Sequence, residues 1–130
     1  MRKGRLVYPR HLFTPKDFAE FIHTRIFDAV WEALGLNDDD LWCLQSAIMS
    51  APKRWPVVPG TGGARKIRFS PTDWPMGKRG ALRVLYAYFD EYKVVALGLI
   101  YPKRERENID ATQKKNIRKA IEEIEAELSR

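Results

Sequence analysis

Basic side chains alternate with apolar ones in three segments of the chain, a spacing that could support phosphate chemistry. Because successive side chains of a strand point to opposite faces, Lys66 and Arg68 would share one face and Ile67 and Phe69 the other. We therefore predict a sheet with an apolar back and a cationic front, which suits a polyanion with regularly spaced phosphates. The segments are GTGGARKIRF at 60–69, GKRGALRVLY at 77–86 and YPKRER at 101–106.

Cations gathered on one face could cleave RNA without a metal ion. One group must position or deprotonate the ribose 2′-hydroxyl, one must stabilise charge on the phosphorane, and one must protonate the leaving 5′-oxygen. Arginine suits the second role because its planar fork binds phosphate bidentately, whereas lysine transfers protons only where neighbouring cations lower its pKa. The alternative is a solvated face that keeps the protein soluble. The candidate catalytic residues are Lys66, Arg68, Arg83, Lys103 and Arg104.

The positive charge is concentrated in the middle of the chain. The formal net charge is +6, but residues 51–106 hold twelve Lys and Arg against four Asp and Glu, and the rest of the chain is slightly acidic. A folded basic segment indicates an anion site, whereas a basic tail would be a solvated arm. The length of 130 residues fits a single domain over residues 1–130 with a real core.

Cofactors, metals and export are not indicated. Cys43 is the single cysteine, so neither an internal disulfide nor a cysteine-based zinc site is possible, and His11 and His23 lie outside the basic region. We therefore expect no cofactor and no metal ligands. No apolar run approaches about 18 residues and no signal-type core follows the basic N-terminus, so we expect a cytoplasmic protein without membrane contact.

The apolar periodicity predicts an α+β fold with a twisted antiparallel sheet, two N-terminal helices and one C-terminal helix. We expect Thr14 to cap a helix that Gly35 ends, because apolar residues recur at helical spacing from Phe18 to Leu34. A second helix should follow over 37–50, with Asp38–Asp40 as helix-start charge. Strands are predicted over 6–8, 64–70, 81–90 and 92–101, with a tight hairpin at 90–91. Thr112 should cap a last helix whose apolar stripe packs as core or serves as a partner surface: Ile117, Ile121, Ile124 and Leu128.

Two further features each allow two interpretations. The loop at 60–63 is glycine-rich like a phosphate cradle, but it lacks the Lys-Ser/Thr ending of a nucleotide loop, so a flexible turn before a strand is favoured. Trp55 and Trp74 flank the basic strands and could stack on bases or anchor their loops.

Taken together, the three segments resemble the RelE/ParE superfamily of type II toxins, and most closely its HigB-like branch of ribosome-dependent mRNA interferases. The similarity covers about residues 41–125, through GTGGARKIRF, then GKRGALRVLYAYF, then LGLIYPKRERENID. The resemblance implies a RelE-like fold and a cytosolic toxin that cleaves mRNA on the ribosome. It also implies a co-expressed antitoxin that neutralises the toxin.

Residue by residue, the resemblance assigns the basic strand side chains to phosphate contact and to metal-free 2′-hydroxyl attack. By motif, the first segment is matched by Arg65, Lys66 and Arg68, the second by Lys78 and Arg83, and the third by Tyr101, Lys103 and Glu105, with Arg104 beside them. Two positions depart from the pattern: Ala81 replaces a second glycine, and the stretch at 108–110 lacks a tyrosine that some members carry. The residues expected to bind RNA are Arg65, Lys78, Arg79, Tyr86 and Tyr101.

Two other functions are compatible with the same fold. One is a gyrase-inhibiting, ParE-like toxin, although members of that group tend to lack a dense Lys and Arg set on the sheet. The other is a non-catalytic module of phage origin that binds RNA or a protein partner through the basic face.

Overall fold

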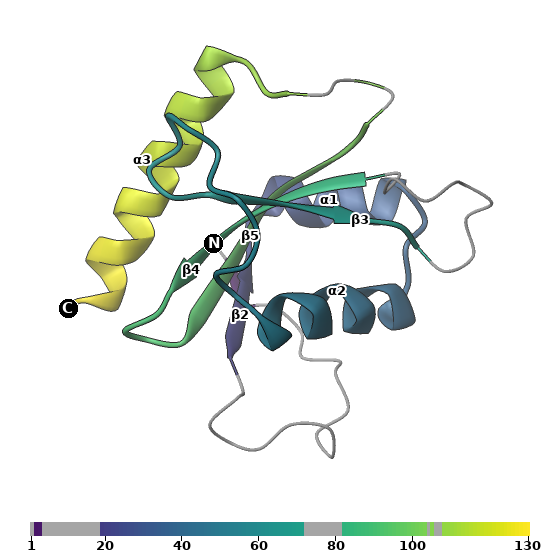
Figure 1. Ribbon diagram of the computed structural model, residues 1–130, viewed down its shortest axis with the longest axis horizontal. Coiled ribbons are helices and arrows are strands. Elements are labelled where there is room, and N and C mark those ends of the chain that lie inside the picture. The colour runs from purple at the N-terminus through teal and green to yellow at the C-terminus, as the bar shows by residue number, and fades with distance from the viewer. Residues whose placement is uncertain (1, 4–18, 72–81, 104, 106–107) are drawn as a thin grey trace.

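The computed structural model describes residues 2–3, 19–71, 82–103, 105 and 108–130 of the chain (Figure 1). Helices and strands are both well represented, and the protein has the predicted α+β fold. The elements in chain order are β1 (Arg2–Lys3), β2 (Glu20–His23), α1 (Arg25–Ala33), α2 (Asp38–Ser50), β3 (Arg65–Phe69), β4 (Leu82–Phe89), β5 (Val94–Pro102) and α3 (Ala111–Leu128).

The strands form one mixed sheet in the order β1-β2-β5-β4-β3. Strands β3, β4 and β5 pair antiparallel as predicted, whereas β2 runs parallel to β5, so the sheet as a whole is mixed. The reason is the long connection from β2 to β5, which carries the chain back to the same end of the sheet before β5 begins.

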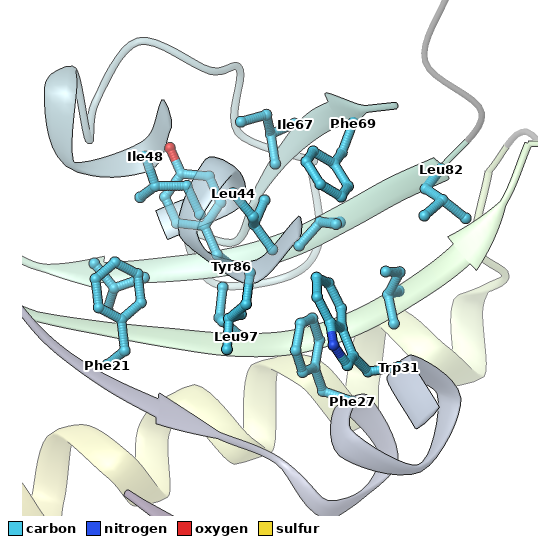
Figure 2. Packing of buried hydrophobic residues seen from close by; sticks show 14 of the residues in the cluster. Phe21, Phe27, Trp31, Leu44, Ile48, Ile67, Phe69, Leu82, Tyr86 and Leu97 are labelled. Atoms are coloured by element: carbon cyan, nitrogen blue, oxygen red, sulfur yellow. The ribbon is translucent and has the colours of Figure 1, made fainter. Parts of the chain in front are cut away.

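Helices α1 and α2 cover one face of the sheet. Trp31 of α1 stacks between Phe27 and Phe69, with ring centroids 5.6 and 6.3 Å apart. Leu44 and Ile48 of α2 are fully buried in the same cluster (Figure 2). Each such side chain contributes roughly 1.5–3 kcal/mol of transfer free energy, so this face forms the main core.

The opposite face of the sheet is covered by α3 and by the segment that precedes β3 (Figure 1). Ala87, Phe89 and Ala96 pack against Ile124, and Leu85 packs with Ile109 and Tyr101. The apolar stripe of α3 thus packs as core, which is the first of the two interpretations that the sequence allowed. The expectation of a cationic front was wrong for most of this face, which is apolar and covered.

The N-terminal helical region differs from the prediction. Residues 20–23 are strand β2, and Thr24 rather than Thr14 caps a helix that begins at Arg25. Phe21 and His23 are buried while Glu20 and Ile22 are half-buried, which is a strand alternation that pairing with β5 imposes. Residues 14–18 and the strand expected over 6–8 lie outside the described residues.

The remaining boundaries agree closely with the sequence. Helix α2 begins with a capping box in which Asn37 and Asp40 bond each other's backbone N–H, so Asp40 is helix-start charge as predicted. Helix α3 is capped by Asp110, two residues before the expected Thr112. In the part of the chain that the structure describes, no helix is long and apolar enough to cross a membrane.

Thr24 joins the start of α1 to an irregularity in β5. The β4–β5 register shifts between Leu85 and Tyr86, which leaves Gly98 as an extra residue. The Thr24 hydroxyl donates to the Gly98 carbonyl at 2.7 Å and accepts from the Phe27 N–H at 3.0 Å. The Thr24 side chain therefore bonds a backbone carbonyl at the bulge and a backbone N–H at the start of α1.

We predict that Thr24→Val lowers the free energy of unfolding by about 1–3 kcal/mol, because the isosteric side chain removes the cap and leaves the Gly98 carbonyl without its donor. Urea unfolding monitored by circular dichroism measures the change. The control is Ser50→Ala, whose exposed hydroxyl bonds only within its own helix and whose loss should matter by less than about 0.5 kcal/mol. Equal effects of the two variants would contradict this role of Thr24.

Candidate nucleic-acid interface

The strand register places the main predicted cations on one face of the sheet. Arg68 lies opposite Arg83, and Arg83 lies opposite Tyr101 on the next strand. Lys66 lies opposite Leu85, two residues along the same face. The prediction that Lys66, Arg68 and Arg83 share a face is therefore confirmed.

A cleft of about 380 Å³ opens on this face beside Lys66. Its apolar surface comes mainly from Leu85, Ile109 and the 56–59 segment. Polar groups stand around this surface, and the Lys66 ammonium donates to the Asn108 carboxamide oxygen at 3.2 Å. The polar lining side chains are Lys66, Tyr101, Asn108 and Lys114.

The segment that forms one wall of the cleft is attached to the edge of β3. The Lys66 backbone N–H donates to the Pro56 carbonyl at 3.1 Å, and the Val58 N–H donates to the Ala64 carbonyl at 2.8 Å. These bonds satisfy an edge that would otherwise expose unpaired backbone groups. They also hold residues 56–58 beside the Lys66 side chain.

The glycine-rich loop at 60–63 is a turn that lets α3 approach β3 closely. Gly60, Gly62 and Gly63 have positive φ, and the buried Thr61 hydroxyl bonds the Val58 carbonyl at 2.7 Å. A Cβ on Gly62 would lie 3.0 Å from Cγ of Arg118. The loop therefore serves the packing of α3, in agreement with the turn interpretation, and this packing brings Lys114 to the cleft.

Arg83 is not an exposed phosphate ligand. Its side chain is 1 % exposed, so it belongs to the interior of the covered face. The expectation that Arg83 stands open to a phosphate was therefore wrong. The reason is that β4 is an interior strand, paired with β3 on one side and β5 on the other, and is covered on both faces.

Arg65 and Tyr86 lie on the other face of the sheet from Lys66. The Arg65 guanidinium donates to the carbonyls of Lys53 and Trp55 at 2.9 and 2.7 Å, so it holds the connection before β3. Tyr86 is buried in the main core, and its hydroxyl donates to the Pro52 carbonyl at 2.6 Å. Neither side chain reaches the cleft, which corrects their assignment to RNA binding.

The other predicted residues divide into three groups. Tyr101 lines the cleft but is only 5 % exposed. Arg68 and Lys103 are exposed, Arg68 on the cleft face of β3 and Lys103 directly after β5. Lys78, Arg79 and Arg104 lie outside the described residues, as does Trp74.

Sequence reasoning missed two lining residues, Asn108 and Lys114. Asn108 lies in the stretch where a tyrosine was sought, and Lys114 lies in the first turn of α3, far along the chain from β3. The signal that could have found Lys114 is the glycine spacing at 60–62, since closely packed glycines indicate another element against the loop.

Two remaining candidates have structural roles. Trp55 is half-buried against the main core with the Arg54 guanidinium 5.2 Å from its ring centroid, so it anchors its loop. Cys43 is half-buried on α2 against the same core. Among the described residues, no three His, Cys, Asp or Glu side chains come together where they could hold a metal ion.

No protein-family model matches this chain.

One prediction concerns Tyr86, which the structure places in the main core rather than in the cleft. Burial raises the pKa of its hydroxyl from 10.0 to about 12, with the nearby Arg65 acting in the opposite direction. Because the unfolded chain releases this proton first, stability is full below pH 10 and falls as the pH rises towards 12. We predict that Tyr86→Phe costs about 1 kcal/mol at neutral pH, through the lost bond to Pro52, and removes up to about 1.4 kcal/mol per pH unit of the alkaline loss.

Urea unfolding of the wild-type and Tyr86→Phe proteins between neutral and strongly alkaline pH measures the free energy of unfolding of each. The difference between the two curves gives the contribution of Tyr86 alone, since the other tyrosines are present in both proteins. Parallel stability curves for wild type and Tyr86→Phe above pH 10 would show that Tyr86 titrates as an exposed phenol.

The second prediction contrasts two arginines that face each other on adjacent strands. Arg83→Ala should lower the free energy of unfolding by about 2–4 kcal/mol, because it empties a buried position and removes its polar contacts. Arg68→Ala should change stability by less than about 0.5 kcal/mol, since Arg68 is exposed. Denaturant midpoints at matched m-values measure both changes. If the Arg83→Ala protein were as stable as Arg68→Ala, a buried, stabilising role for Arg83 would be contradicted.

Proposed function

We propose that the protein is the toxin of a type II toxin–antitoxin pair and a ribosome-dependent mRNA endoribonuclease. The observation that carries the proposal is the cleft, in which two lysines, a tyrosine and a carboxamide surround an apolar surface. Ammonium groups suit phosphate oxygens, and an apolar surface suits the flat face of an unpaired base. The three RelE-like segments of the sequence support the same function.

The proposed reaction is transfer of the phosphodiester to the neighbouring ribose hydroxyl. The 2′-oxygen attacks phosphorus, the bond from phosphorus to the 5′-oxygen breaks, and a 2′,3′-cyclic phosphate and a free 5′-hydroxyl form. The proton lost by the 2′-hydroxyl is balanced by the proton gained at the 5′-oxygen. The roles that the protein must supply are proton transfer and stabilisation of the phosphorane, which cationic side chains would provide in place of a metal ion.

The cleft offers groups for each role. Lys66 and Lys114 would contribute positive charge from β3 and α3, and Tyr101 also lines the cleft. Lys66 would be oriented by its bond to Asn108, so its ammonium is held in the cleft. Arg68 and Lys103 are exposed and would contact flanking phosphates. Arg83 would not contact RNA, and its buried side chain would instead stabilise the fold around β4.

The partners follow from the same proposal. Side chains that mainly contact phosphate read little sequence, so presentation of the mRNA by the ribosome would select the cleavage site. The protein would act in the cytoplasm, where translating ribosomes are found. A cognate antitoxin would keep the cationic groups covered while the toxin is silent.

A second candidate is a non-catalytic module that binds RNA through the same cleft. The burial of Arg83 favours it, because this candidate catalytic arginine is only 1 % exposed. Such a module would bind ribosomes or mRNA without breaking the phosphodiester.

We predict that expression of the wild-type protein stops growth and produces new mRNA 5′ ends within translated codons, and that Lys66→Ala abolishes both. One lost donor to the transition state typically costs about 10²–10³ in rate. The control is Lys93→Ala, an exposed lysine in the β4–β5 turn, which should keep full toxicity. Mapping of 5′ ends and growth curves provide the readout.

Three results would decide among the functions. Growth arrest with in-frame cuts supports the nuclease. Growth arrest without cuts but with a DNA-damage response supports a gyrase inhibitor. Ribosome binding with neither cuts nor DNA damage supports the binding module, and both of the latter results contradict the proposed nuclease.

A further inference from the structure

The charges on α3 are separated into two halves of opposite sign. Three of the four cations are exposed and Lys114 is half-buried, while all four carboxylates are exposed. The cations lie in the half that begins beside the cleft, and the carboxylates lie in the half that ends the helix. The cations are Lys114, Lys115, Arg118 and Lys119, and the carboxylates are Glu122, Glu123, Glu125 and Glu127.

This arrangement opposes the electrostatics of the helix. The N-terminus of a helix carries partial positive charge and favours carboxylates, yet after the capping Asp110 α3 has no acidic residue in its first turn, and it has no basic residue in its last. The pairs Arg118–Glu122 and Lys119–Glu123 also place the cation first, which is the weaker order at this spacing. Helix stability therefore does not account for where these cations stand.

The cationic half of α3 is continuous with the cleft. Lys114 lines the cleft together with Lys66. One turn further on, the Arg118 side chain lies over the backbone of Gly62, where an added Cβ would come within 3.0 Å of its Cγ. The glycine loop thus holds this half of the helix beside the cleft, and the exposed Lys115 and Lys119 follow Lys114 and Arg118 along the helix.

A polyanion fits this cationic surface better than an apolar partner does. In the described part of the chain, the exposed large hydrophobic side chains are Ile26 and Val57, and neither belongs to α3. The outer side of the helix therefore offers charge without an apolar anchor, which is the character of a phosphate-contacting surface.

We propose that the first half of α3 binds the phosphodiester backbone of RNA as a continuation of the cleft, and that the acidic second half marks where this contact ends. The proposal rests on the proposed function, since it names the surface by which the same protein would hold its RNA. The phosphates could belong to ribosomal RNA or to mRNA, and the chemistry of recognition is the same for both.

The test is the salt dependence of binding by the full-length protein. Labelled wild type, Lys115→Gln/Lys119→Gln and the control Lys93→Gln/Arg130→Gln are titrated with vacant ribosomes, with mRNA-programmed ribosomes and with single-stranded RNA. The control removes the same charge from exposed positions outside the cationic half. Because each phosphate contact releases counterions, losing two should reduce the slope of log affinity against log salt by roughly 1.5.

The proposal expects this reduction for Lys115→Gln/Lys119→Gln and a wild-type slope for the control. The thermal stability of Lys115→Gln/Lys119→Gln should equal that of wild type, because only the removal of structurally important side chains would lower it. A reduction seen already with vacant ribosomes assigns the contact to ribosomal RNA, and one seen only when mRNA is present assigns it to mRNA.

An unchanged slope in Lys115→Gln/Lys119→Gln, an equal reduction in the control, or no binding by wild type would overturn the proposal. Failure of the nuclease function is a separate outcome: salt-dependent binding through α3 would persist while mRNA remained uncut.

Discussion

Strand β4 is buried on both faces, and this constraint determines where a functional site can lie. One face packs under α1 and α2, and the other packs under α3 and the segment before β3. Even Arg83 is enclosed, with 1 % of its surface exposed. The helices and the segment before β3 cover the centre of this sheet, so RNA cannot reach cations there. Accessible cations lie instead at the β3 edge, where this covering layer ends.

The cleft lies at that boundary. Backbone bonds from β3 to residues 56–58 build one wall, and the glycine loop lets the first turn of α3 build another. Lys66 and Lys114 come from elements almost fifty residues apart, and the packing of the second face brings them to one space. The same packing that buries Arg83 therefore assembles the groups that the proposed function uses.

The sequence predicted most of what depends on local patterns. The alternation in β3 correctly separated Lys66 and Arg68 from Ile67 and Phe69, and the Asn37–Asp40 spacing correctly predicted the start of α2. These features succeed because neighbouring residues decide them, through side-chain alternation and capping.

What depends on long-range packing was not predictable in the same way. The apolar spacing around Phe21 fits a helix as well as a strand, and only pairing with β5 decides between them. Tyr86 and Arg83 have the residue types of a binding site, but the layers above them come from distant parts of the chain. Lys114 joins the site only through the contact of α3 with the glycine loop.

Lysine footprinting would show whether the cleft between β3 and α3 contacts RNA on the ribosome, as we propose. The purified protein would be briefly acetylated free and bound to mRNA-programmed ribosomes, and each lysine quantified by mass spectrometry. We expect strong protection of Lys66 and Lys114 and unchanged reactivity of Lys93, which lies in the β4–β5 turn. Acetylation of Lys66 and Lys114 at the same rate in the bound and free protein would contradict the proposal.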